Sequence, residues 1–121
     1  MTTVKTLQTI DAETLNQRLK GTQPPILINA LARDAYVAKH IPGSINIPTE
    51  NAETTEEIIP YKDAEIVVYC ANADCTASPE LAQKLEDMGY TNVKDFEKGL
   101  AGWRSAGYKL VGEEAWLKWL I

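Results

Sequence analysis

Short apolar runs alternate along the chain with stretches in which apolar residues recur at helical spacing. A short continuous apolar run is typical of a strand that is buried on both faces of a sheet. The strongest such run is Glu65–Tyr69, and the others are residues 4–7, 26–28, 44–47 and 93–96. The expected helices cover residues 11–21, 34–40, 54–59, 78–89 and 99–107. This alternation predicts an α/β domain with a mostly parallel central sheet flanked by helices.

Terminal signals mark two of the expected helices. Asp11 is placed to cap the first helix, because its carboxylate can accept from the free amides of the first turn. The helix that follows residue 77 is expected to start with Ser78 at the N-cap, Pro79 at the first helical position and Glu80 after it. Gly89 is expected just beyond the end of that helix, where a left-handed backbone conformation is common.

Composition limits the classes of protein and partner. The chain has 121 residues, 45% hydrophobic and 24% charged, so we expect one folded domain over residues 1–121, with its core over about residues 4–108. A tryptophan-bearing amphipathic segment is expected at residues 113–121. The net charge of −5 argues against nucleic acid or an anionic membrane as partner. No apolar run approaches the ~20 residues of a membrane span, and no signal peptide pattern is visible at the N-terminus.

Cysteine usage indicates a reducing compartment. Cys70 and Cys75 are the two cysteines of the chain, fewer than a secreted disulfide scaffold of this size would carry, so we expect a cytoplasmic protein. His40 is its one histidine, and with so few nitrogen and sulfur ligands we expect no metal site.

Cys70 is the strongest candidate for chemistry. It ends the most apolar strand and is followed by a short loop, residues 71–76, and the start of a helix. Ligands of open α/β sheets bind beyond the carboxyl ends of the strands, where loop amides and a helix N-terminus favour an anion. Such a field favours the thiolate, which is the nucleophilic form of cysteine. The alternative interpretation is a buried, unreactive cysteine.

Three segments in this order resemble the single-domain rhodanese family. They are residues 27–48, which contain His40-Ile41-Pro42-Gly43, then residues 66–70, and then residues 85–103, which end in Glu97-Lys98-Gly99-Leu100-Ala101-Gly102-Trp103. The resemblance implies a three-layer rhodanese-like fold and a sulfurtransferase. Cys70 would take sulfane sulfur as a persulfide from thiosulfate, polysulfide or a low-molecular-weight persulfide. It would pass the sulfur to a thiol acceptor, small molecule or carrier protein, or to cyanide. No cofactor is implied. The substrate-binding loop would comprise Ala71, Asn72, Ala73, Asp74, Cys75 and Thr76.

The chain departs from the family pattern at several positions. The family loop reads Cys-x-x-x-x-Arg/Lys-Ser/Thr, and here Cys75 stands where the cation is usual. Asn29 and Leu31 replace a family Asp and Arg, and Lys98 replaces one of two glycines. A loop without its cation should hold the thiosulfate dianion poorly, because charge-assisted hydrogen bonds are the stronger ones. We therefore expect weak thiosulfate activity and a preference for a less charged donor.

Cys75 has two interpretations. It is either a resolving thiol, which attacks the Cys70 persulfide or forms a disulfide with Cys70, or a small residue that fills the place of the cation. For the whole chain, the alternative to an enzyme is a non-catalytic binding or regulatory module on the same scaffold. Phosphatase chemistry is disfavoured, because neither position 75 nor position 76 is an arginine that could clamp an oxyanion.

Overall fold

A computed structural model describes residues 7–114, and these form a parallel sheet with helices on both faces. The strands are β1 (Gln8–Thr9), β2 (Ile26–Asn29), β3 (Ile45–Asn46), β4 (Ile66–Tyr69) and β5 (Val93–Phe96). The α-helices are α1 (Ala12–Leu19), α2 (Arg33–Ala38), α3 (Thr55–Ile58), α4 (Ala77–Asp87) and α5 (Gly99–Ser105), and a 3₁₀ helix, η1, covers Thr49–Thr54. The predicted α/β architecture is confirmed.

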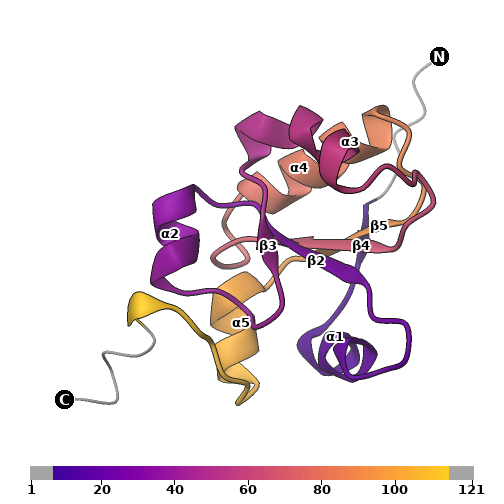
Figure 1. The fold of residues 1–121 in the computed structure, drawn as a ribbon. Coiled ribbons are helices and arrows are strands. Elements are labelled where there is room, and N and C mark those ends of the chain that lie inside the picture. Colours follow the sequence, from indigo (N-terminus) through magenta and orange to yellow (C-terminus); the bar gives the residue numbers. More distant parts are fainter. Residues whose placement is uncertain (1–6, 115–121) are drawn as a thin grey trace.

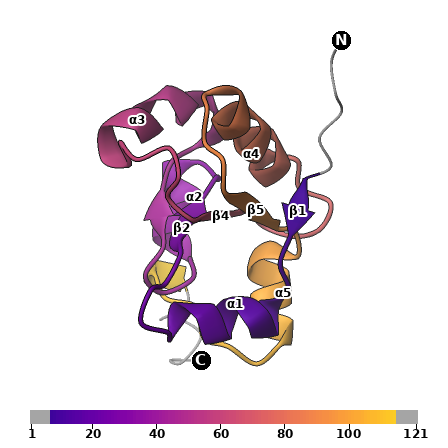
Figure 2. The same ribbon diagram turned by 90° about the vertical axis from the view of Figure 1, so that its right-hand side faces the viewer.

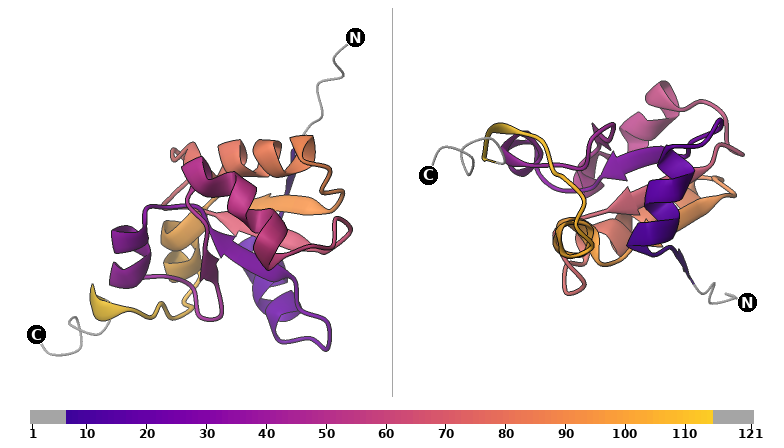
Figure 3. Two further views of the ribbon diagram at one scale, coloured as in Figure 1. Left: turned by 45° about the horizontal axis from the view of Figure 1, so that its top comes forward. Right: turned by 90° about the horizontal axis from the view of Figure 1, so that it is seen from below.

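The sheet has the order β1-β5-β4-β2-β3, and every neighbouring pair is parallel. Figures 1 and 2 show three layers, with α3 and α4 on one face of the sheet and α1 and α5 on the other. The same division appears in Figure 3, where tilting the molecule brings first one pair of helices and then the other in front of the sheet. The sheet order places β4 at the centre, so its carboxyl end is flanked by the ends of β2 and β5.

Strand β4 is buried on both faces, as its continuous apolar run predicts. Its four side chains are 0% exposed. Ile66 and Val68 belong to the core cluster under α4, and Val67 and Tyr69 belong to the cluster under α1 and α5. Burying a large apolar side chain stabilises the fold by roughly 1.5–3 kcal/mol. The strand that delivers Cys70 is therefore packed between the two core clusters.

Several element boundaries differ from the expected ones. The edge strand expected at residues 4–7 is observed at Gln8–Thr9, while residues 1–6 lie outside the described part of the chain. The helix expected at residues 54–59 is observed as the short α3, and η1 directly precedes it. Most of the expected amphipathic segment, residues 115–121, also lies outside the described part. Within residues 7–114, no helix is long and apolar enough to cross a membrane.

Candidate functional site

Cys70 lies immediately after β4, at the carboxyl edge of the sheet, and its side chain is 1% exposed. The loop of residues 71–76 leads from it to the N-terminus of α4. Cys75 is half-buried, while Asn72, Asp74 and Thr76 are exposed. The predicted nucleophile is thus covered, and the loop that follows it forms the outer wall of the site.

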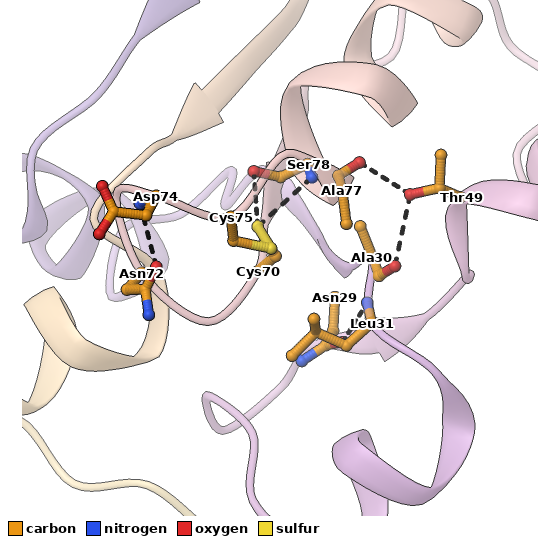
Figure 4. Close-up of a disulfide and its surroundings, with 10 residues drawn as sticks. All are labelled: Asn29, Ala30, Leu31, Thr49, Cys70, Asn72, Asp74, Cys75, Ala77 and Ser78. Carbon is orange, nitrogen blue, oxygen red and sulfur yellow. Dashed lines mark hydrogen bonds between the residues drawn. A yellow bond between two sulfur atoms is a disulfide. The ribbon is translucent and has the colours of Figure 1, made fainter.

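In the structure Cys70 and Cys75 form a disulfide, and their Cα atoms are 6.4 Å apart (Figure 4). Asn72 causes the loop to fold back. Its carbonyl oxygen accepts from the backbone amide of Cys75 at 3.1 Å, and its side-chain oxygen accepts from the amide of Asp74 at 3.0 Å. Asparagine often stabilises a tight turn in this way. The turn brings the second sulfur onto the first, so these two loop amides are used within the loop.

Ser78 contacts the Cys70 sulfur through two polar groups. Its backbone amide donates to Cys70 Sγ at 3.4 Å, and its hydroxyl oxygen lies 3.3 Å from the same sulfur. The sequence pattern predicts Ser78 as the N-cap of α4, but the N-cap is Thr76 and the helix begins at Ala77, two residues earlier than expected. Ser78 therefore lies inside the first turn and is 1% exposed. A backbone amide that donates from a helix N-terminus is suited to stabilising an anionic sulfur.

Asp95 is a second polar residue that the sequence pattern did not single out. It lies on β5 and is 3% exposed. Burial raises the pKa of its carboxyl group, a hydrogen bond with Ser78 opposes this rise, and the negative charge of Glu97 adds to it. Its Oδ1 atom has no hydrogen-bond partner among the described residues. Ser78 thus lies between a buried carboxyl group and the Cys70 sulfur.

The N-terminus of α5 fixes the start of the loop from the opposite side. The amide of Leu100 donates to the Cys70 carbonyl at 3.0 Å, and that of Ala101 donates to the Ala71 carbonyl at 3.0 Å. This close approach requires Gly99, which has φ +56° and whose added Cβ would lie 2.1 Å from the Cys70 carbonyl oxygen. Lys98 has φ −76°, which any residue adopts. Of the two glycines in the family pattern, the one replaced here by Lys98 is therefore not required by the loop, and the required one, Gly99, is present.

At the end of β2, hydrogen bonds of side-chain amides occupy the region where the family pattern has an Asp and an Arg, here Asn29 and Leu31. The Asn29 side-chain oxygen accepts from the Leu31 amide at 2.9 Å. The Asn46 side-chain amide donates to the carbonyls of Asn29 and Leu31 at 3.1 and 2.8 Å. Nearby, the Thr49 hydroxyl donates to the Ala77 carbonyl at 2.7 Å (Figure 4). The Thr49 amide also donates to the carbonyl of Ala30, the residue after β2, at 3.3 Å, so uncharged hydrogen bonds through Thr49 link the end of β2 to the start of α4.

Two other residues of the family motifs have structural contacts. The His40 ring stacks on Tyr36 with centroids 3.9 Å apart, and its Nδ1 lies 2.7 Å from the Tyr36 carbonyl oxygen. Trp103 is 4% exposed and donates to the Lys109 carbonyl at 3.0 Å. Over residues 7–114, no group of three or more His, Cys, Asp or Glu side chains is placed to hold a metal ion.

The fold is a parallel α/β domain whose central strand leads a cysteine to the N-terminus of a helix at the carboxyl edge of the sheet. Residues 11–106 match the family model described as "Rhodanese-like domain", and the chain belongs to this family. A Pseudomonas aeruginosa structure titled thiosulfate sulfurtransferase is similar with a TM-score of 0.80 and 26% identity, over 88% of this chain and 20% of that one.

Two curated relatives give a mixed picture of function. The chain is 37% identical over 97 residues to an HTH-type transcriptional regulator, Rv0324, of Mycobacterium tuberculosis, covering 79% of this chain and 41% of the regulator. It is 28% identical over 105 residues to a sulfurtransferase of Allochromatium vinosum, covering 87% of this chain and 95% of that protein. The chain thus spans about two fifths of the regulator and nearly the whole of the sulfurtransferase.

Proposed function

We propose that this protein is a sulfurtransferase that carries sulfane sulfur as a persulfide on Cys70. The observation that carries the proposal is the contact of the Ser78 amide and hydroxyl with Cys70 Sγ, at the N-terminus of α4. Family membership and the sulfurtransferase relatives support it. The substrates are a small sulfur donor, namely thiosulfate, polysulfide or a low-molecular-weight persulfide, and an acceptor that is a thiol or cyanide.

The reaction starts from the reduced protein. The Cys70 thiolate attacks the outer sulfur of the donor, and the bond between that sulfur and the rest of the donor breaks. With thiosulfate the leaving group is sulfite, and with a persulfide it is a thiolate. The Cys70 persulfide then carries one negative charge, which the Ser78 amide stabilises. An acceptor attacks the outer sulfur and releases the Cys70 thiolate, so that one transfer proceeds in two covalent steps.

Charge at the loop supports a preference for singly charged donors. Cys75 lies against the reactive sulfur where the family usually has a cation, and the adjacent Asp74 is acidic. Two variants without the second thiol test the effect of charge alone. Cys75→Arg should bind thiosulfate about tenfold to 100-fold more tightly than Cys75→Ser, because a hydrogen bond to a charged group is worth roughly 1.5–3 kcal/mol. Equal thiosulfate binding by the two variants would contradict this account of donor choice.

Mass spectrometry of the loaded protein tests the persulfide. Reduced Cys75→Ser protein is incubated anaerobically with thiosulfate, with glutathione persulfide and with polysulfide, and is then weighed intact. We expect an added mass of about 32 Da, one sulfur atom, that disappears on addition of cyanide. The matched control is Cys70→Ser in the same background, which should gain none. If no donor loads the protein, or if the adduct survives Cys70→Ser, the proposed function is wrong.

The regulator relative favours a second candidate, a binding or regulatory module without turnover. Its specific support is the 37% identity to the transcriptional regulator. The module predicts that reduced Cys70 reacts with iodoacetamide no faster than an ordinary thiol at neutral pH, while the enzyme predicts rapid, stoichiometric alkylation of Cys70. The Cys75→Ser variant makes Cys70 the one thiol in the assay.

A further inference from the structure

Cys75 reaches one particular sulfur atom. The disulfide joins its Sγ to the Sγ of Cys70, which is the inner sulfur of the persulfide in the proposed function. The turn at Asn72 holds Cys75 in that place through two hydrogen bonds. Attack on this atom therefore needs no movement of the backbone away from the described fold.

We propose that Cys75 attacks the inner sulfur of the Cys70 persulfide, so that the protein reduces sulfane sulfur to sulfide and releases it. This inference rests on the proposed function and adds a product to it. The bond between the two cysteine sulfurs forms, and the bond between the inner and outer sulfurs of the persulfide breaks. The outer sulfur leaves as hydrosulfide with the electron pair of that bond and the proton of the Cys75 thiol. The two cysteines are oxidised to the disulfide, and the sulfane sulfur is reduced.

The sulfur atom that Cys75 attacks determines whether sulfide is released or the outer sulfur is transferred to Cys75. Exchange at sulfur proceeds in line, so a thiolate that approaches the inner sulfur expels the group on the far side. A thiol that attacked the outer sulfur would instead take that atom and leave Cys70 as a free thiolate. The observed bond to the inner sulfur favours release. A thiol acceptor in solution competes for the outer sulfur, so the protein has two products whose ratio depends on the acceptor concentration.

Regeneration needs a thiol reductant, and burial determines where it attacks. Cys70 is 1% exposed, whereas Cys75 is half-buried. An external thiolate therefore attacks the Cys75 sulfur and forms a mixed disulfide there, while Cys70 leaves as a thiolate beside the Ser78 amide. A second thiol group, from a dithiol or from another monothiol, then frees Cys75. Each cycle consumes one sulfane sulfur and two thiol groups, and it yields one sulfide and one external disulfide.

A single-turnover experiment tests the release of sulfide. Reduced wild-type and Cys75→Ser proteins, freed of reductant under anaerobic conditions, are mixed with thiosulfate at a concentration that fully loads Cys75→Ser. Thiosulfate is chosen because its leaving group is sulfite and not sulfide. We expect wild type to release one sulfide per chain and to end about 2 Da lighter than the dithiol form. Cys75→Ser should keep the added sulfur and release sulfide on the order of 100-fold more slowly, because it lacks the intramolecular nucleophile.

A Cys75→Ser/Gln23→Cys double variant is the control for position. Gln23 is exposed and precedes β2, at the amino edge of the sheet, whereas Cys70 lies at the carboxyl edge, so a thiol there is present but distant from Cys70. This variant should load and not release. Equal persulfide lifetimes in wild type and Cys75→Ser, equal sulfide release by the double variant, or sulfur mapped onto Cys75 would overturn the inference. The proposed function fails separately, if Cys75→Ser takes up no sulfur from any donor.

Discussion

Gly99 supports the reactive loop through backbone approach, and replacing it tests that support. The Cβ of alanine at this position would lie 2.1 Å from the Cys70 carbonyl oxygen and 2.8 Å from its carbonyl carbon. Both are backbone atoms of the residue that carries the nucleophile, so neither can rotate away. The φ of +56° adds the cost of a left-handed conformation in a residue with a side chain.

A substitution at Gly43 measures the cost of a positive φ without the cost of a steric clash. Gly43 also has a positive φ, +83°, but nothing lies within 4 Å of its added Cβ. Gly43→Ala should therefore lower the free energy of unfolding by roughly 1–2 kcal/mol, the cost of the left-handed conformation alone. Gly99→Ala should lower it by about 2–5 kcal/mol, because a clash of the kind produced by overpacking adds roughly 1–3 kcal/mol.

Chemical denaturation of the two variants and the wild type, all in the reduced state, measures these differences. We also expect Gly99→Ala to slow the alkylation of Cys70, since the shifted carbonyl moves Sγ away from Ser78, whereas Gly43→Ala should leave that rate unchanged. If Gly99→Ala costs no more stability than Gly43→Ala, the close approach of α5 to the loop is not a determinant of this site.

Three further changes have expected outcomes. Hydrogen bonds from Arg18 hold the pKa of Glu65 below its ordinary value of 4.5, so this pair contributes stability above that pH, and the contribution is lost as the pH falls through the lowered pKa. Urea denaturation should accordingly show Glu65→Gln destabilised at about pH 7 and nearly equal to wild type at about pH 2. Ser78→Ala should change the rate of Cys70 alkylation at neutral pH by less than about threefold, because the backbone amide that donates to the sulfur is retained. Burial raises the pKa of Asp95 above 3.8, so its ionisation costs stability as the pH rises. As the pH rises through the raised pKa of Asp95, the free energy of unfolding of Asp95→Asn should therefore increase relative to that of the wild type. If denaturation curves show the same difference in stability at every pH, the pKa of Asp95 is not raised.

Local sequence patterns are sufficient to predict the order of elements and the position of Cys70. The apolar run of residues 66–69 specifies a strand buried on both faces whatever its neighbours are, and the residue after such a strand lies at the carboxyl edge of the sheet. A glycine just beyond a helix is also a pattern that can be recognised without knowledge of the fold. Gly89 has a φ of +102°, which confirms the expected end of α4.

The partners of Cys70 could not be predicted, because they depend on contacts between elements. Ser78 followed by Pro79 fits an N-cap as a local pattern, yet the Cys70 sulfur holds the serine inside the first turn. Asp95 interrupts an apolar strand, which is a visible signal. Its proximity to Ser78 follows from the pairing of β5 beside β4, and an alternation of strands and helices does not specify that order.

The charges around Cys70 link the choice of donor to the release of sulfide. The neutral Ser78 amide donates to the sulfur, and the Ser78 side chain is hydrogen-bonded to the buried Asp95 carboxyl group. Neutral donors stabilise a dianion less well than an arginine would, and an ionised carboxylate opposes any added anion. A persulfide that stays on Cys70 keeps one negative charge in this acidic setting. Attack by Cys75 removes that charge with the departing hydrosulfide and leaves a neutral disulfide. The absence of a cation thus weakens the loading of thiosulfate and at the same time favours the step that expels the sulfur.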